Sequence, residues 1–289
     1  MSARRQRGLV ALLLAAAILT SVATALVIRQ ANSVRQAGDQ ISVTNARLEA
    51  VRKAMVYFVM NNGRLPCPAD GDIAIGLATA GAEARTAATG ACTAMARGVA
   101  PWVTLGLPEA EGQDAWGRRL SYKVYSGVTG LTVDGGALIT NCDSDFATPA
   151  LTPASAAVGP AFLCAAPPAT RTLPDTVLDP VRRPGLPLTD HGVAIAQVGF
   201  VLVSHGATGR GAWLPGGGRM ALPVVPPAPA TNPETPNTLA PSAGVIYARR
   251  NASDKTIGID QPALYFDDIV IYMTIQNLLS AAGTTARNW

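Results

Sequence analysis

The sequence is poor in charge, in aromatic residues and in histidine. Charged residues make up 15% and aromatic residues 5% of its 289 residues, and the two histidines are His191 and His205. The formal net charge is +4, of which Arg4, Arg5 and Arg7 supply three charges. No later cluster of Lys and Arg interleaved with aromatics follows, so the concentrated basic face that phosphate backbones need is missing. We therefore predict no nucleic-acid partner.

Cysteine is scarce as well, and its spacing argues against zinc. The four cysteines form no CxxC pair, and only two histidines could add ligands. An even number of cysteines in an oxidising compartment instead predicts two disulfides. Three pairings are open; the simplest joins Cys67 to Cys92 and Cys142 to Cys164, and each loop closed in this way is worth about 3 kcal/mol.

Near its start the chain has one long uncharged apolar run, GLVALLLAAAILTSVATALVI, from Gly8 to Ile28. A helix of about 20 apolar residues is long enough to cross a bilayer. The preceding arginines favour a cytoplasmic N-terminus. We therefore predict a basic leader at residues 1–8 and a transmembrane half-helix at 9–28. This arrangement describes a single-pass membrane protein whose remainder lies outside the cytoplasm, and the family resemblance given below implies a bacterial inner membrane with a periplasmic head.

Residues 29–62 continue the helical pattern, but their pattern is amphipathic. Apolar residues recur at spacings of three, four and seven, while charged residues occupy other faces. The apolar positions are Val34, Ala37, Ile41, Leu48, Val51, Met55 and Phe58. We predict one helix from about Leu9 to Asn61, ended by Asn61-Asn62-Gly63, whose amphipathic half packs on a sheet.

The remaining segment, residues 63–289, predicts an α+β head with an antiparallel sheet. Strand-like runs separated by turn residues suit hairpins. They are Leu120 to Tyr125, Leu131 to Val133, Ala137 to Thr140, His191 to Ser204, Gly244 to Ala248 and Leu264 to Thr274. Stretches rich in Pro and Ala at 143–190 and 214–241 predict long loop insertions. A short helix is expected around Gly81 to Ala88, and a helical turn after Ile275.

Several segments together resemble those of one protein family. They are the leader MSARRQRG ending at Gly8, the apolar helix from Leu9, NGRLPCPADGD at 62–72, QDAWGRRLSYKV at 113–124, FVLVSHGATGRGA at 200–212 and FDDIVIYMT at 266–274. On these segments the chain resembles type IV pilins and the pseudopilins of type II secretion systems. The resemblance is firm over the first 70 residues and patchy thereafter.

The resemblance implies an assembly subunit with no enzymatic activity. A prepilin peptidase would cleave between Gly8 and Leu9, leaving an amino terminus of the kind that undergoes methylation in such proteins. The implied partners are other pilin or pseudopilin subunits, contacted through the N-terminal helix, together with the peptidase, an inner-membrane assembly platform and the lipid bilayer. The product would be a periplasmic or extracellular filament.

One position departs from the family pattern. Most major pilins carry a glutamate that neutralises a neighbour's amino terminus, and this chain has Leu13 there. A buried charge left without its partner is costly, which disfavours a place along the shaft. Subunits that lack this glutamate are often found at the filament tip, so the resemblance favours a minor subunit with such a position.

Two alternatives remain open from the sequence. One is a non-polymerising periplasmic binding or interaction protein anchored in the inner membrane. The other is a secreted domain with an ordinary signal peptide, because Ala23-Thr24-Ala25 offers an A-x-A cleavage site. The first residue of the mature protein distinguishes all three hypotheses.

Catalytic and phosphate-binding patterns are incomplete. Ser204 and His205, with Asp190, Asp267 or Asp268, suggest a hydrolytic triad, but neighbours in a strand point to opposite faces. No G-x-S-x-G turn presents a serine. The glycines at 216–218 lack the Lys-Ser or Lys-Thr of a phosphate loop and predict a flexible turn. We predict no catalytic and no cofactor-binding residues.

Aspartate pairs provide the one metal hypothesis. Alternate spacing can place carboxylates round a calcium ion, and some pseudopilins hold calcium in a late loop. The candidates are Asp70 with Asp72, Asp143 with Asp145, and Asp260 with Asp267 and Asp268. None completes an EF-hand, so solvated turn aspartates are the favoured interpretation and calcium the alternative. Trp116 is expected to anchor the core.

Overall fold

A computed structural model describes residues 3–86, 91–126, 130–132, 184–222, 232–240, 245–253, 257, 261 and 263–282. The chain divides into two compact units, Met1–Val43 and Thr44–Trp289. Helix α1, Ala3–Asn62, crosses the boundary between them without a break. The other elements are β1 (Ala69–Asp70), η1 (Met95–Arg97), β2 (Gly98–Val99), η2 (Glu109–Gly112), β3 (Ser121–Val124), β4 (Leu186–Asp190), β5 (Val193–Ser204), α4 (Thr235–Thr238), β6 (Tyr247–Arg249), β7 (Ile269–Thr274) and α5 (Ile275–Ala281).

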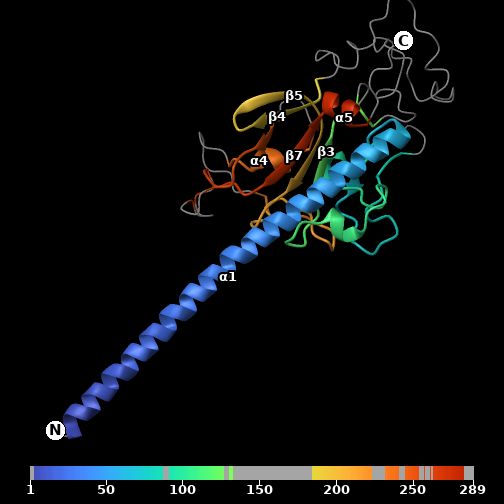
Figure 1. The fold of residues 1–289 in the computed structure, drawn as a ribbon. Helices are drawn as coiled ribbons and strands as arrows, with labels where there is room; N and C mark the ends of the chain where they lie inside the picture. Colours follow the sequence, from blue (N-terminus) through green and yellow to red (C-terminus); the bar gives the residue numbers. More distant parts are fainter. Residues whose placement is uncertain are drawn as a thin grey trace, which may run out of the picture. The chain divides into compact units, whose positions relative to one another are not determined.

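The strands of the described part of the second unit form one seven-stranded sheet (Figure 1). Its order is β1-β2-β3-β5-β4-β6, and β7 pairs with β5 as well. Strand β5 is the organising element, because β3, β4 and β7 all pair with it in antiparallel fashion. Strands β4 and β6 pair in parallel, so the sheet is mixed.

The last part of α1, within the second unit, packs on one face of this sheet. Leu48, Val51, Met55 and Val59 are completely buried at helical spacing. They join a core cluster that includes Leu120, Tyr122, Val124, Phe200, Leu202, Met273, Ile275 and Leu278. Removing these side chains from water stabilises the unit by about 1.5–3 kcal/mol for each large apolar residue.

The opposite face of the sheet carries a second core, formed where β5 bends. Gln197 has a left-handed backbone, with φ of 55°, and the ladders on both sides of β5 shift register near this point. The β4–β5 hairpin therefore returns towards β7, where the Tyr272 hydroxyl donates to Asp190 Oδ2 at 3.0 Å. The cluster between them comprises Leu186, Leu188, Val198, Val201, Val203, Tyr247 and Val270.

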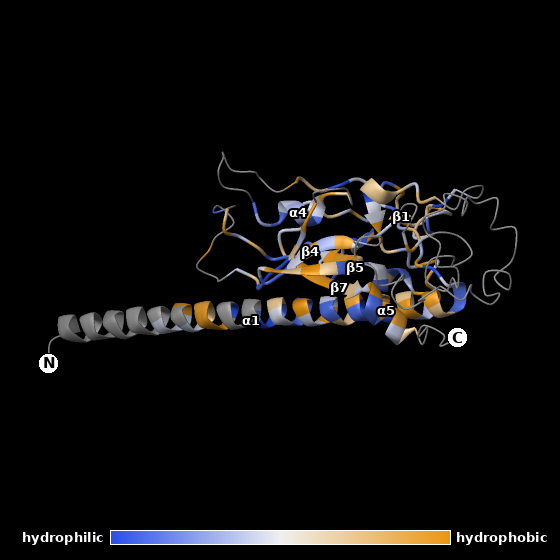
Figure 2. Cartoon of the chain, turned by 90° about the horizontal axis from the view of Figure 1, so that it is seen from above, coloured by the Kyte–Doolittle hydropathy of each residue, from blue (hydrophilic) through white to orange (hydrophobic). Residues whose placement is uncertain are grey.

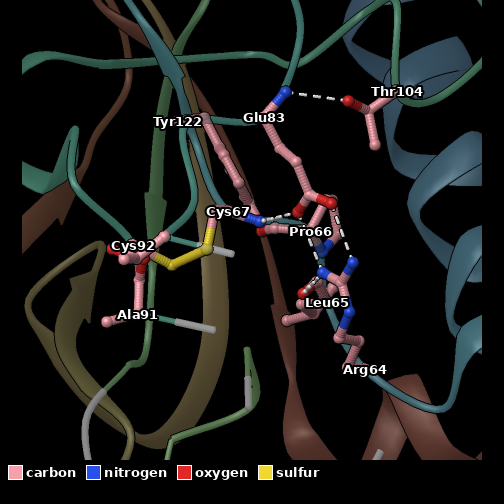
Figure 3. The surroundings of a disulfide bond; sticks show 10 residues. Arg64, Leu65, Pro66, Cys67, Glu83, Ala91, Cys92, Thr104 and Tyr122 are labelled. Carbon is pink, nitrogen blue, oxygen red and sulfur yellow. Dashed lines mark hydrogen bonds and ion pairs between the residues drawn. A yellow bond between two sulfur atoms is a disulfide. The ribbon is translucent and has the colours of Figure 1, made fainter. Parts of the chain in front are cut away.

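A disulfide joins Cys67 to Cys92 just beyond the end of α1 (Figure 3). This is the simplest of the pairings considered from the sequence. Beside it, Glu83 accepts the Cys67 N–H at 2.9 Å and forms an ion pair with Arg64 at 2.7 Å. The disulfide and the ion pair fasten the chain leaving α1 to the segment around residue 83.

The structure corrects the predicted fold in several places. The sheet is not purely antiparallel, because β4 and β6 run parallel. Strand β4 also lies at the end of the predicted loop 143–190, and α4 lies within the predicted loop 214–241. No helix forms at residues 81–86 of the expected Gly81 to Ala88 helix. Glu83 and Arg85 instead make isolated bridges to Ala69 and Cys92.

The prediction of a transmembrane half-helix at 9–28 is also overturned. Among the described residues, no helix combines the length and the apolar character needed to cross a membrane. The pilin-like helix with a membrane-embedded half is therefore not found, and the single-pass inner-membrane assignment is corrected with it.

Some predictions fall outside the described residues. They are the second cysteine pair, Cys142 and Cys164, the aspartates Asp143, Asp145 and Asp260, and the strand expected at Ala137 to Thr140.

Candidate functional site: a buried carboxylate and histidine cluster

Polar side chains gather round residues 204–211, SHGATGRG, a segment that begins at the last residue of β5. Gly206 has a left-handed backbone, with φ of 54°, and a Cβ there would lie 2.1 Å from the Asp267 carbonyl oxygen. Glycine is required at this position, because any side chain would collide with the backbone before β7. The close approach brings residues of β3, of the segment after β5 and of the segment before β7 near one another.

Asp114 anchors one side of this segment. Its Oδ1 accepts the backbone N–H groups of Trp116 and Arg118, each at 2.9 Å. Its Oδ2 accepts the Ser204 hydroxyl at 2.9 Å and lies 3.4 Å from Arg118 Nε. The Arg118 guanidinium also donates to the carbonyls of Gly206 and Ala207. The aspartate thus closes its own turn and holds the end of β5.

The same stretch connects to α1 within the second unit. The Ala115 N–H donates to Thr44 Oγ1 at 3.1 Å, and Arg47 donates to the Asp114 carbonyl at 2.9 Å. This gives the QDAWGRRLSYKV motif a structural role. Trp116 is only half-buried and lies against the Arg118 guanidinium, so the prediction of a core anchor was wrong. Among the described tryptophans, Trp102 and Trp213 are the buried ones.

On the other side, Ser121, His205 and Asp268 lie in the order of a hydrolytic triad. Ser121 Oγ is 3.0 Å from His205 Nε2, and His205 Nδ1 is 3.4 Å from Asp268 Oδ1. All three residues are at most 5% exposed. A substrate therefore has no access to Ser121 in this conformation. The arrangement is better suited to joining β3 to the start of β7 than to nucleophilic attack.

Asp268 belongs to a group of three carboxylates, with Glu234 and Asp267. One oxygen from each lies within 4.8 Å of the others. The Asp267 N–H donates to Glu234 Oε1 at 3.1 Å, while Asn237 Nδ2 donates to Asp268 Oδ2 at 2.8 Å. Asp267 itself accepts from Thr208, through the backbone N–H at 2.8 Å and the hydroxyl at 2.9 Å.

Two oxygens of this group lack hydrogen-bond partners among the described residues. They are Glu234 Oε2 and Asp268 Oδ1, the second of which lies 3.4 Å from His205 Nδ1 as an ion pair. Glu234 is fully buried. Burial, followed by repulsion from Asp268 and Asp267, raises the pKa of Glu234 to about 8. A buried acceptor without a partner is costly and needs an explanation in a folded protein.

The structure brings together only some of the candidate residues. Ser204 and His205 diverge, as expected of neighbours in a strand, with Ser204 bonded to Asp114 and His205 to Ser121. Asp190 lies elsewhere, between Tyr272, His191 and Arg249. The sequence interpretation missed both Ser121 and Glu234. Their positions depend on strand register and on the chain's path before α4, and no spacing in the sequence signals either.

Asp70 and Asp72 share Arg97 as a cationic partner. Arg97 donates to both oxygens of Asp70, at 2.9 and 2.8 Å, and its Nε lies 3.1 Å from Asp72. The hydrogen bonds from Arg97 lower the pKa of Asp70. The turn-aspartate interpretation fits this pair.

The remaining candidates are backbone positions. The glycines at 216–218 lie in a tight turn, in which the Leu214 N–H donates to the Gly218 carbonyl at 3.0 Å. Gly8 and Leu9, the predicted processing site, lie inside α1. No protein-family model matches the chain, and neither a curated protein nor a solved structure shows significant similarity to it.

Proposed function

We propose that this protein is a structural subunit of a pilin-like or pseudopilin-like filament, assembled through α1. The observation that carries the proposal is an exposed apolar stretch on that helix. Leu26, Val27 and Ile28 are 60%, 67% and 54% exposed, and Val22 and Ile41 are exposed as well. The hydropathy colouring shows apolar turns, in orange, along α1 (Figure 2). Large contiguous apolar surfaces on a folded protein generally mark an interaction site.

The direction of these side chains indicates the kind of partner. Successive residues of an α-helix point about 100° apart, so Leu26, Val27 and Ile28 together face more than half of the helix circumference. A single flat partner surface would contact only the side chains that point in one of these directions. A helix that is apolar on most sides suits the interior of a bundle, and a filament provides such an interior by stacking many copies or relatives of one helix.

The second unit has the character of a rigid domain that such a helix could carry. Several of its described polar groups, among them Asp114, Arg118 and Ser204, are engaged in internal bonds. The Ser121–His205–Asp268 arrangement is buried rather than open to a substrate. These features favour a role in assembly over a role in bond chemistry.

Position in the filament and maturation are parts of the same proposal. Leu13 provides no carboxylate to neutralise a neighbouring amino terminus, which favours a minor subunit over a shaft subunit. The leader ending at Gly8 would be removed by a prepilin-type peptidase. N-terminal sequencing of the protein from its native host tests this part, and a mature start at any residue other than Leu9 would contradict it.

Self-association of the full chain tests the assembly role. The triple variant Leu26→Gln, Val27→Gln and Ile28→Gln should reduce oligomers in sedimentation velocity and in cross-linking. A matched control changes three similarly exposed apolar residues outside α1, Leu77, Val103 and Leu264, which are 55% to 61% exposed. The control should associate like the wild type. Equal association of all three proteins would refute the proposal.

A further inference from the structure

We propose that Asn237 closes the edge of the sheet at β6 and so keeps this strand from pairing with β6 of a second copy of the chain. This role does not depend on the filament proposal. Strand β6 is the last in the order β1-β2-β3-β5-β4-β6, so one of its sides has no neighbouring strand among the described residues. A strand with such a side offers its N–H and C=O groups as a template for another chain.

The side chain of Asn237 occupies the open side of β6. Its Oδ1 accepts the Ala248 N–H at 2.9 Å, and its Nδ2 donates to the Ala248 carbonyl, also at 2.9 Å. Nδ2 donates as well to Asp268 Oδ2 at 2.8 Å. Asn237 is completely buried and Ala248 is 5% exposed. The amide therefore covers the two main-chain groups that a further strand would need.

The two hydrogen bonds to Ala248 have the pattern of a β-ladder. In an antiparallel pair, two residues that lie opposite each other exchange both of their N–H···O bonds. The amide of Asn237 supplies one N–H donor and one carbonyl oxygen, which is what a residue of a partner strand supplies. Ala248 of a second copy carries the same two groups and would meet them about a two-fold axis. A second β6 is therefore the partner that Asn237 excludes.

Contacts with other parts of the second unit hold Asn237 in this position. The Arg219 guanidinium donates to the Thr238 carbonyl at the end of α4. Before α4, Glu234 Oε1 accepts the Asp267 N–H at 3.1 Å. Pro236 lies in the first turn of α4 and restricts its backbone. The short helix is thus fastened on both sides of the residue that covers the edge.

Sedimentation velocity of the full chain tests this role. All proteins carry Leu26→Gln, Val27→Gln and Ile28→Gln, so that the comparison is made in one background with the exposed apolar stretch of α1 removed. Adding Asn237→Ala should lower the dissociation constant of a dimer by about 30-fold, the gain expected from two typical hydrogen bonds. Circular dichroism checks the fold, and Asn237→Ser provides a milder variant if the alanine protein does not fold.

Thr238→Ala is the matched control. Thr238 is 3% exposed, and its hydroxyl donates to the Thr235 carbonyl within α4 rather than to β6. This variant should weaken the helix, leave the edge covered and associate like the background protein. Equal association of the Asn237 variant and this control would overturn the proposal.

A second change shows whether the dimer uses the edge. The Ala248 N–H points to Asn237 rather than to β4, so Ala248→Pro removes a donor from the edge and none from the β4–β6 ladder. Combined with Asn237→Ala, it should abolish the new dimer. Hydrogen exchange at Ala248 in Asn237→Ala should become slower as the protein concentration rises. A dimer that persists with Ala248→Pro, or exchange that is independent of concentration, would place the contact elsewhere and refute the role of Asn237.

Discussion

Arg64 holds Glu83 through both terminal nitrogens of its guanidinium, at 2.9 Å to Oε2 and 2.7 Å to Oε1 (Figure 3). The pair is largely buried, with the two side chains 8% and 17% exposed. Glu83 also accepts the Cys67 N–H, and its own N–H donates to Thr104 Oγ1 at 2.8 Å. One carboxylate therefore organises the chain leaving α1.

Removing Arg64 should be costly, because it leaves the Glu83 charge buried without its partner. We expect Arg64→Met to lower the free energy of unfolding by about 3 kcal/mol at pH 7, measured by urea denaturation. The double variant Arg64→Met with Glu83→Gln should recover part of this loss, since it removes the unpaired charge. A double variant less stable than the single one would contradict the ion-pair interpretation.

The same pair predicts a pH dependence. Burial acts to raise the pKa of Glu83, but the hydrogen bonds from Arg64 and from the Cys67 N–H outweigh it and lower the pKa below 4.5. The folded state therefore binds the proton less tightly than the unfolded state. The stabilisation is complete above about pH 4.5 and is lost as the pH falls through the lowered value. Urea titrations from pH 6 to pH 3 should show a steeper decline for the wild type than for the double variant.

The disulfide should contribute as much as the ion pair. Cys67 and Cys92 are 25 residues apart, and closing a loop of that length restricts the unfolded chain by about 3 kcal/mol. Replacing both cysteines with serine should lower the free energy of unfolding by that amount in non-reducing buffer. Adding a reductant to the wild type should give at least this loss, because it also reduces any bond between Cys142 and Cys164, and no loss in either case would argue against the bond.

Asp114 should matter more than any one of its partners. Asp114→Asn places an amide N–H group towards Arg118 and removes the charge that balances it, so we expect a loss of about 3–5 kcal/mol. Ser204→Ala removes a single hydrogen bond to the same carboxylate and should cost about 1.5–3 kcal/mol. Chemical denaturation of both variants provides the comparison. A larger effect for Ser204→Ala would show that Asp114 is not the centre of this network.

Local periodicity predicted much of the secondary structure, and tertiary pairing explains what it missed. In β7 the alternation of apolar residues from Ile269 to Thr274 is a local signal, and the strand lies within the range that it predicts. In β4, the presence of Pro187 led to the prediction of a loop instead of a strand. The register shifts between Leu186 and Leu188, so Pro187 needs no ladder hydrogen bond there.

The candidate site was less accessible to sequence reasoning. His205 and Asp268 stood out as residue types with possible chemistry, but their partner Ser121 follows from the register that sets Ser121 opposite Val203. Glu234 lies in a Pro-rich stretch that predicts a loop. Its burial against Asp267 results from the chain path, which no local pattern encodes.

Lys123 provides the sharpest electrostatic test in the second unit. It lies on β3 opposite Val201 of the second core and is 1% exposed. Burial, assisted by repulsion from Arg219, lowers the pKa of its ammonium to about 7. The unfolded chain binds this proton up to about pH 10.5, whereas the folded chain releases it near pH 7. The contribution of Lys123 to the free energy of unfolding therefore increases as the pH rises from about 7 to about 10.5.

Replacing Lys123 with methionine keeps the length of the side chain and removes the titrating amine. Lys123→Met should be more stable than the wild type at pH 6, where folding must bury the charge. Its advantage should shrink as the pH rises towards 10, because the wild-type amine then enters the fold uncharged at little cost. Urea denaturation of both proteins at pH 6, 8 and 10 measures this difference. A constant difference across the three values would show that Lys123 keeps its proton in the folded state and that the burial argument fails.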